Sequence, residues 1–330
     1  MPYDPQHSVF ATIGDFYKRT QPSTGKAVKR IIHCINPFLA KPGTEHDRAQ
    51  RVTLTSMTVA RRTASVVCPE IDVVFGKITL GDDFDSGLIE FDIHRTLTRS
   101  VLDLADFDVP RPLPLVMDLF TAVPVGRDDV FIFTNTDIAL SSNFYGFVQS
   151  VFERGVDCAI INRRTISDYY KNEQDLALMA IETGTPHPGF DCFAMRGELR
   201  DKLMPYDSCV GIGGVMLPLV YQLLAFAKHP VVLLDAHATF HLGNDKSWTN
   251  EDFADYSKHN RKEIDRIFAT LIEKPDQKEI LLQRLSGAHE PWIFKDNLKR
   301  LAGLREGVNS QPDIGIIERL KLAASCLYRQ

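Results

Sequence analysis

Short apolar runs alternate with longer amphipathic segments along the first two thirds of the chain. Residues 50–64 place their apolar side chains at helical spacing between two of these short runs. A short β-rich run that ends at a turn signal such as Asn36-Pro37 is typical of a buried strand in a parallel sheet. Runs of this kind lie at 29–36, 71–75, 130–134 and 158–162. Their alternation with helices predicts a doubly wound α/β fold, with a mostly parallel central sheet flanked by helices.

Further periodic segments extend this fold. Helices are expected at 112–122, 144–152 and 213–227, and additional strands at 189–194, 231–234 and 238–242. The pattern is weaker between residues 76 and 111. There we expect a solvated loop, followed by a weak helix or strand near 94–104. The acidic residues of that loop are Asp82, Asp83 and Asp85.

The last 80 residues have a different pattern. From residue 251 onward, charged and apolar residues alternate at helical spacing, with breaks at Pro275 and Pro291. The chain is therefore predicted to consist of a catalytic α/β domain at 1–250 and a C-terminal helical subdomain at 251–330.

Composition narrows the class of protein. The 330 residues are 44% hydrophobic and 25% charged, as in an ordinary globular protein, and the net charge of −5 argues against a nucleic-acid binder. None of the six cysteines forms a C-x-x-C pair, which favours buried thiols in a reducing compartment. Residues 1–25 lack an apolar signal core, and the apolar stretch 215–227 is too short to span a membrane. We therefore expect a cytoplasmic protein. Peripheral membrane contact and oligomeric state stay open.

A polar turn follows the apolar strand predicted at 130–134. It reads Asn135-Thr136-Asp137 and lies at the carboxyl end of the strand, which is the edge where open α/β sheets bind ligands. Asn135 and Asp137 are two residues apart, so in extended geometry they face the same side. Oxygen ligands of this kind suit Mg²⁺ or Mn²⁺, which neutralise a diphosphate as Lewis acids. The alternative is that Asp137 caps a helix beginning near Ser141.

A second candidate motif lies near residue 240. Here His241 is followed by Gly243, Lys246 and Trp248. An imidazole ligates Mn²⁺, a glycine lets the backbone approach a phosphate closely, and a lysine supplies a positive charge to phosphate oxygens. The alternative is a surface turn with an ordinary histidine.

Together the two motifs resemble GT-A glycosyltransferases, and most of all the retaining family 8 group that includes glycogenin and lipopolysaccharide galactosyltransferases. That family has an Asp-x-Asp turn where this chain has Asn135-Thr136-Asp137, and a His-x-x-Gly-x-x-Lys-Pro-Trp motif where this chain has the shorter 241–248. Residues 188–193 are loosely similar to a further strand of the family. The resemblance covers roughly residues 28–250 and departs from the family at Asn135, at the shortened spacing and at Ser247.

The resemblance implies a metal-assisted transferase. It implies that Asp137 and His241, assisted by Asn135, hold Mn²⁺ or Mg²⁺, that Lys246 contacts the donor diphosphate, and that Asn36 lies near the base or ribose. The donor is a nucleoside diphosphate sugar, with a UDP-sugar expected, and the acceptor is a glycan or a lipid-linked sugar.

Two further groups are candidates for contacts to the donor. Asp191 lies in an apolar run, where an unpaired carboxylate is costly, so it either acts on the donor sugar or pairs with Arg163 or Arg196. Arg163 and Arg164 follow a buried strand and suit an anionic ligand, although Glu173 or Asp175 are alternative partners. We take Asp191 and Arg164 as the catalytic candidates.

The rival hypotheses are a nucleotidyltransferase that makes the nucleotide sugar and a non-catalytic sugar- or nucleotide-binding protein. The first lacks a Gly-rich triphosphate loop after the first strand. The second gains support from Asn135, because it removes one charge from the predicted metal site.

Overall fold

The computed structural model describes residues 8–22, 25–81, 84–187, 189–243 and 251–286. Within these residues, eight strands form a central sheet in the order β1-β11-β7-β10-β5-β2-β3-β4. Their bounds, in the order of the sheet, are β1 Phe10–Ala11, β11 Pro230–Leu233, β7 Cys158–Ile161, β10 Cys192–Arg196, β5 Val130–Thr134, β2 Arg30–Ile35, β3 Asp72–Leu80 and β4 Ile93–Leu97.

One strand runs against all the others. β10 is antiparallel to both of its neighbours, β5 and β7, whereas the remaining pairings of this sheet are parallel. Cys192, the first residue of β10, therefore lies opposite Thr134 and Ile161, the last residues of β5 and β7. The prediction of an α/β fold with a mostly parallel central sheet is confirmed.

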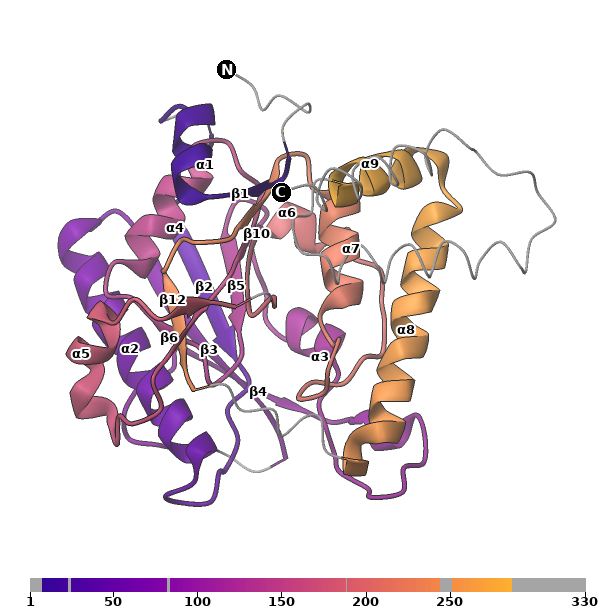
Figure 1. Cartoon of the computed structure of the whole chain (residues 1–330), viewed down its shortest axis with the longest axis horizontal. Helices are drawn as coiled ribbons and strands as arrows, with labels where there is room; N and C mark the ends of the chain where they lie inside the picture. Colours follow the sequence, from indigo (N-terminus) through magenta and orange to yellow (C-terminus); the bar gives the residue numbers. More distant parts are fainter. Residues whose placement is uncertain (1–7, 23–24, 82–83, 188, 244–250, 287–330) are drawn as a thin grey trace, which may run out of the picture.

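Helices cover both faces of the sheet (Figure 1). One face packs against α1 Ile13–Arg19, α2 Glu45–Val67 and α4 Phe144–Phe152. The other packs against α3 Val116–Thr121, α6 Gly197–Arg200, α7 Leu217–Phe226, α8 Ala254–Ile272 and α9 Pro275–Ser286. Short 3₁₀ helices lie at Val101–Asp103, Glu173–Asp175 and Glu251–Phe253. None of the described helices combines the length and the apolar character that a membrane span requires.

A second, smaller sheet lies beside the end of the central one. Its order is β6-β12-β8-β9, and α5 (Leu176–Ile181) packs against it. The strands are β6 Ala139–Leu140, β12 Thr239–Leu242, β8 Arg164–Ile166 and β9 Thr185–Pro186. β6 follows β5 and β8 follows β7 after short turns, so both continue chain segments that leave the central sheet at the carboxyl ends of β5 and β7.

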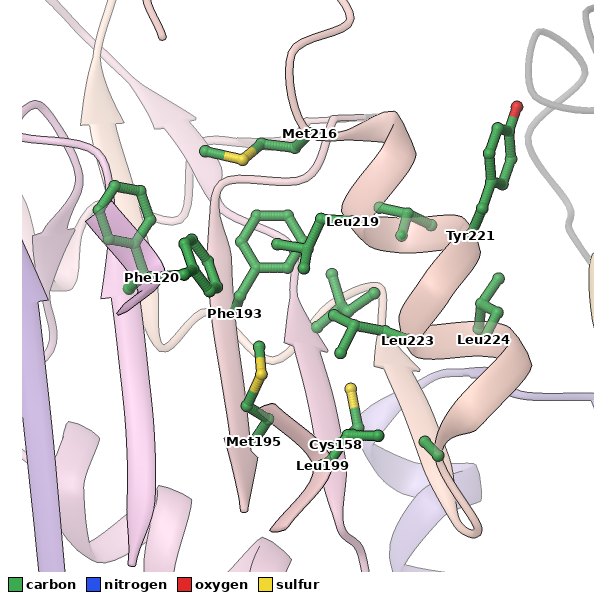
Figure 2. Close-up of a cluster of buried hydrophobic side chains, with 14 of the residues drawn as sticks. Phe120, Cys158, Phe193, Met195, Leu199, Met216, Leu219, Tyr221, Leu223 and Leu224 are labelled. Atoms are coloured by element: carbon green, nitrogen blue, oxygen red, sulfur yellow. The ribbon is translucent and has the colours of Figure 1, made fainter. Parts of the chain in front are cut away.

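Helix α7 packs against the sheet on one side and against α8 and α9 on the other. Figure 2 shows Leu219 and Leu223 of α7 directed toward Phe193 of β10, while Tyr221 and Leu224 point away from the sheet. The Tyr221 ring meets Phe268 of α8, with ring centroids 5.0 Å apart. α8 and α9 therefore share one apolar cluster with α7 and the sheet. The subdomain boundary at residue 250 stays a prediction.

Several bounds differ from those that the sequence predicts. β3 continues to Leu80, although the apolar run ends at Phe75. Gly76 permits this continuation, because a Cβ there would lie 2.5 Å from Cys34 Sγ on the neighbouring strand. α7 begins at Leu217 rather than 213, since Gly214 has a φ of +74° that a helix cannot include. The acidic residues Asp82 and Asp83 lie outside the described residues.

The core packing makes a quantitative prediction. Leu223 of α7 is fully buried, whereas Leu178 of α5 is 55% exposed. Leu223→Ala should lower the free energy of unfolding by about 2–5 kcal/mol because it leaves a cavity, and Leu178→Ala by less than about 1 kcal/mol. Urea denaturation of the two variants measures both values. Equal losses would show that α7 does not pack as described.

His33 predicts how stability depends on pH. It is fully buried between Tyr145 Oη and Thr134 Oγ1, each 2.9 Å away, and burial lowers its pKa to about 3. The unfolded chain takes up this proton near pH 6.5, so the stabilisation is complete above that pH and is lost as the pH falls toward 3. Each pH unit below 6.5 costs up to about 1.4 kcal/mol.

The measurement is the free energy of unfolding at pH 7.5 and pH 5, for the wild type and His33→Gln. The wild type should lose about 2 kcal/mol more than the variant over this interval. Identical losses would contradict the assignment of the pH dependence to His33.

Candidate functional site

Polar residues from three segments meet at one edge of the central sheet. Asn135 and Asn162 directly follow the last residues of β5 and β7, and Asp191 directly precedes the first residue of β10. Because β10 is reversed, its start lies beside the ends of its two neighbours. The candidate site forms where these three segments leave the sheet.

Asp137 and His241 lie face to face. The turn after β5 is closed by the Ile138 backbone N–H, which donates to Asn135 O at 3.2 Å. The chain then enters β6, which pairs with β12 through Thr239 and Phe240. This pairing brings two residues 104 positions apart into contact, with Asp137 Oδ2 3.2 Å from His241 Nε2. Asp137 therefore faces His241 instead of capping a helix.

The contacts of His241 leave a place for a proton or a metal ion between the two side chains. Nδ1 lies 2.9 Å from the carbonyl oxygen of Gly243, which only accepts, so Nδ1 carries a proton. In the neutral imidazole, Nε2 then presents a lone pair toward Asp137 Oδ2, which is also an acceptor. Two facing acceptors are favourable only when a proton or a metal ion lies between them.

The surroundings of Asp137 favour its ionised form, which binds cations. Burial opposes its ionisation, but the hydrogen bond to His241 and the charges of His241 and Arg163 outweigh this effect and lower the pKa of Asp137. Its second oxygen, Oδ1, is buried and has no hydrogen-bond partner among the described residues. One imidazole nitrogen and two carboxylate oxygens make a donor set that suits Mn²⁺ or Mg²⁺.

Asp137 and His241 are a set of two candidate metal ligands in the described part of the chain. This part contains no group of three or more His, Cys, Asp or Glu side chains placed to hold one ion. No hydrogen bond among the described residues joins the Asn135 side chain to Asp137 or His241, so the part expected of Asn135 stays a prediction. Ions that bind phosphate substrates often take one or two protein ligands and complete their shell with phosphate oxygens and water.

A pocket of about 230 Å³ opens beside the pair. Its lining combines the pair with the first turn of α2 and the end of β12: Glu45, His46, Arg48, Ala49, Asp137, Asp168, His241, Leu242 and Gly243. α2 is 23 residues long and begins at the pocket, where Thr44 caps it by accepting from the backbone N–H of Asp47. Such a helix end favours anions because its first N–H groups point outward.

Arg48, which no sequence motif singled out, also belongs to the pocket. Its guanidinium lines the pocket, and its Nε is buried without a hydrogen-bond partner in the described structure. The sequence signal that identifies this end of α2 is the capping residue Thr44 followed by Asp47. Nothing in that signal indicates that the helix starts beside His241.

Asp191 pairs with Arg163, one of the two partners considered from the sequence. Arg163 Nε is 3.0 Å from Asp191 Oδ2, but the two atoms are not aligned for a hydrogen bond. His187 completes the group, with Nε2 3.4 Å from Arg163 Nη2 and 4.0 Å from Asp191 Oδ2. Burial raises the pKa of Asp191 despite the nearby Arg163, and burial together with Arg163 and His241 lowers the pKa of His187 to about 4.

Arg164 has a different environment. Its Nη2 donates to Ala180 O at 2.6 Å, and the guanidinium lies 5.4 Å from the centroid of the Phe240 ring. Glu173, an alternative partner considered for it, pairs with Arg51. Arg164 thus ties α5 to the small sheet.

Of the remaining predicted site residues, Asn36 and Gly243 lie in the part of the chain that the structure describes. Asn36 donates from Nδ2 to Ile78 O at 2.6 Å, which links the carboxyl ends of β2 and β3. Gly243 has a φ of +68°, and its carbonyl oxygen accepts a hydrogen bond from His241 Nδ1. Lys246 and Trp248 lie outside the described residues.

No protein-family model matches the chain, and no curated protein matches it significantly. Several solved structures have a loosely similar arrangement. The chain overlaps TarS of S. aureus with a TM-score of 0.47 and 11% identity, over 78% of this chain and 43% of that one, so it spans less than half of the TarS chain. Residues 1–349 of TarS in complex with UDP-GlcNAc give 0.42 and 8%, covering 78% and 80%.

The galactosyltransferase LgtC, in complex with donor and acceptor sugar analogues, overlaps with a TM-score of 0.30 and 8% identity, over 71% of this chain and 96% of that one. Scores below 0.5 describe a loose similarity of fold. The functional argument for this chain therefore rests on its own site.

The conformation of Gly243 provides a test of the site. A Cβ at this position would lie 3.0 Å from Asp168 Cβ, and the positive φ strains any other residue. Gly243→Ala should lower the free energy of unfolding by about 1–2 kcal/mol. The control Gly14→Ala lies in α1 with ordinary space around it and should be neutral or stabilising by up to about 1 kcal/mol. Chemical denaturation measures both; a neutral Gly243→Ala would contradict the described turn.

Proposed function

We propose that this protein is a GT-A-type glycosyltransferase that moves a sugar from a nucleoside diphosphate sugar to a glycan or lipid-linked acceptor. The observation that supports this most strongly is the facing pair Asp137 and His241, with the unpartnered Asp137 Oδ1, at the ligand-binding edge of the sheet. The resemblance of the motifs around both residues to family 8 supports the same activity.

The pair is proposed to hold Mn²⁺ or Mg²⁺, with Asn135 assisting. When bound, such an ion neutralises the charge that develops on a departing diphosphate. Asp137 supplies the negative charge, and His241 supplies a neutral nitrogen whose orientation is fixed by the bond from Nδ1 to Gly243 O. Because the ion needs further ligands, diphosphate oxygens are the natural ones, and binding of metal and nucleotide should depend on each other.

The positive groups around the pocket are proposed to bind the diphosphate. The N-terminal turn of α2 and the guanidinium of Arg48 face the same pocket as His241. Gly243 leaves room for close approach of the backbone, and Lys246 is proposed to neutralise the departing nucleotide. Asn36, which is held against Ile78 O, is placed at the end of β2 toward the base or ribose in this proposal.

Asp191 is proposed as the carboxylate that acts on the donor sugar, because its Oδ2 is buried and pairs with Arg163 at the edge of the sheet where β5 and β7 end. Arg164 acts from behind the site by holding α5 and the small sheet in place. We expect the helices of 251–330 to shape the acceptor side, and the protein to work in the cytoplasm.

A thermal-shift screen tests the function. The protein is heated with UDP, GDP, CDP or ADP, each with Mn²⁺ or with EDTA. One nucleotide, with UDP expected, should raise the melting temperature only in the presence of metal, since a ligand at 100 times its Kd stabilises the native state by about 2.7 kcal/mol. Asp137→Asn and His241→Ala should abolish the shift. Asp168→Asn, which changes another carboxylate of the same pocket, should retain it.

The possible results separate the hypotheses. A shift that is equal in EDTA would reject the metal assignment. No shift with any nucleotide would overturn the transferase proposal. A metal-dependent shift without release of sugar from the nucleotide sugar, with or without acceptor, would indicate a binding protein, whereas stabilisation by a nucleoside triphosphate and a sugar phosphate would indicate a nucleotidyltransferase.

A further inference from the structure

We propose that Asn162, Arg163 and Asp191 form a subsite for the hydroxyl groups of a neutral sugar, and that Arg163 rather than Arg164 is the arginine that contacts the donor. This inference rests on the proposed function and specifies its substrate class.

The three residues share one level of the sheet. Ile161 and Cys192 lie opposite each other, so Asn162 and Asp191 come directly after and before a paired position of β7 and β10. Arg163 follows Asn162 and reaches Asp191 at 3.0 Å. The subsite adjoins the metal pair, because the charge of Arg163 acts on Asp137 and the charges of Asp137 and His241 act on Asp191.

Each residue presents a buried polar atom that lacks a hydrogen bond within the described structure. These atoms are Asn162 Oδ1, Arg163 Nε and Asp191 Oδ2. Asn162 is 4% exposed and Arg163 is 8% exposed, so bulk water does not satisfy them. Arg163 Nε and Asp191 Oδ2 contact each other as an ion pair without the alignment of a hydrogen bond, and Asn162 Oδ1 has no partner in the described structure. The cluster therefore retains hydrogen-bonding capacity that a polar ligand would satisfy.

The chemistry of Asn162 Oδ1, Arg163 Nε and Asp191 Oδ2 indicates which ligand fits. A guanidinium N–H donates, whereas a carboxylate oxygen and an amide oxygen accept. A hydroxyl group both donates and accepts, so one hydroxyl can receive the Arg163 proton and donate to Asp191. A phosphate would meet the charge of Asp191, and a cation would meet that of Arg163. Adjacent hydroxyls of a neutral sugar satisfy the whole set.

The adjacent arginine does not have this role. Arg164 Nη2 is already bonded to Ala180 O, and its side chain packs over Phe240. Successive residues of an extended segment point to opposite sides, so Arg163 faces the site when Arg164 faces α5. The pair of arginines thus divides into one that contacts the ligand and one that supports the small sheet.

The experiment compares a nucleotide with its sugar conjugates by titration calorimetry in Mn²⁺. The probes are UDP, UDP-glucose, UDP-N-acetylglucosamine and UDP-glucuronate; if another base gives the metal-dependent shift, its own conjugates replace them. Asn162→Ala and Arg163→Gln should raise the Kd of a neutral UDP-sugar about tenfold and leave the Kd of UDP unchanged. Asp191→Asn preserves the shape and should have the same effect, which keeps the test available if an arginine variant does not fold.

Matched controls exclude general effects of the substitutions. Asn143→Ala removes an exposed asparagine that makes no capping bond, and Arg127→Gln removes a surface arginine that pairs with Glu198. Both should bind UDP and the UDP-sugars like the wild type. In the wild type, UDP-glucuronate should bind more weakly than UDP-glucose, because its carboxylate approaches Asp191.

Two results would overturn the inference while leaving the proposed function intact. In the first, the variants weaken UDP and UDP-sugar equally, which would place the residues at the diphosphate. In the second, UDP-sugar binding is unchanged in all three variants, which would show that the cluster holds only buried water. If no nucleotide binds to the wild type, the proposed function and this inference fail together.

Discussion

The reversed direction of β10 is the constraint on which the candidate site depends. In an entirely parallel sheet, the start of a strand lies at the edge opposite the ends of its neighbours. Because β10 runs against β5 and β7, the residue before it, Asp191, reaches the same edge as Asn135 and Asn162. Three polar segments therefore meet where the backbone hydrogen bonds of the sheet hold them.

The small sheet adds the second part of the site. Pairing of β6 with β12 positions Asp137 against His241, and the residues beside them, Ile138 and Phe240, are fully buried. The two carboxylates then differ in environment. His241 and Arg163 outweigh burial and lower the pKa of Asp137, whereas burial prevails and raises the pKa of Asp191. Such divergence is typical of carboxylates that have different tasks in one site.

Local patterns predicted the bounds of two elements correctly. The bounds of β5 and α4 agree with the expected 130–134 and 144–152, because an apolar run with polar residues at both ends leaves one arrangement that buries it. The prediction ended β3 too early, since Gly76 and Lys77 are typical of loops. The structure instead buries Lys77 and lets its Nζ donate to Phe84 O at 2.7 Å, a contact that sequence spacing does not reveal.

The sequence by itself determined that the chain forms an α/β fold and that the turn with Asp137 follows the end of a strand. It placed Asp191 inside a strand at 189–194, whereas the structure places it directly before β10. Only the tertiary structure decided which polar residues meet. It paired Asp191 with Arg163 rather than Arg196, directed Arg164 toward α5 and placed Arg48 beside His241. The physical reason is that periodicity in the sequence shows only which residues share one face of a single element. Contacts between residues 104 positions apart depend on how separate elements pack and pair.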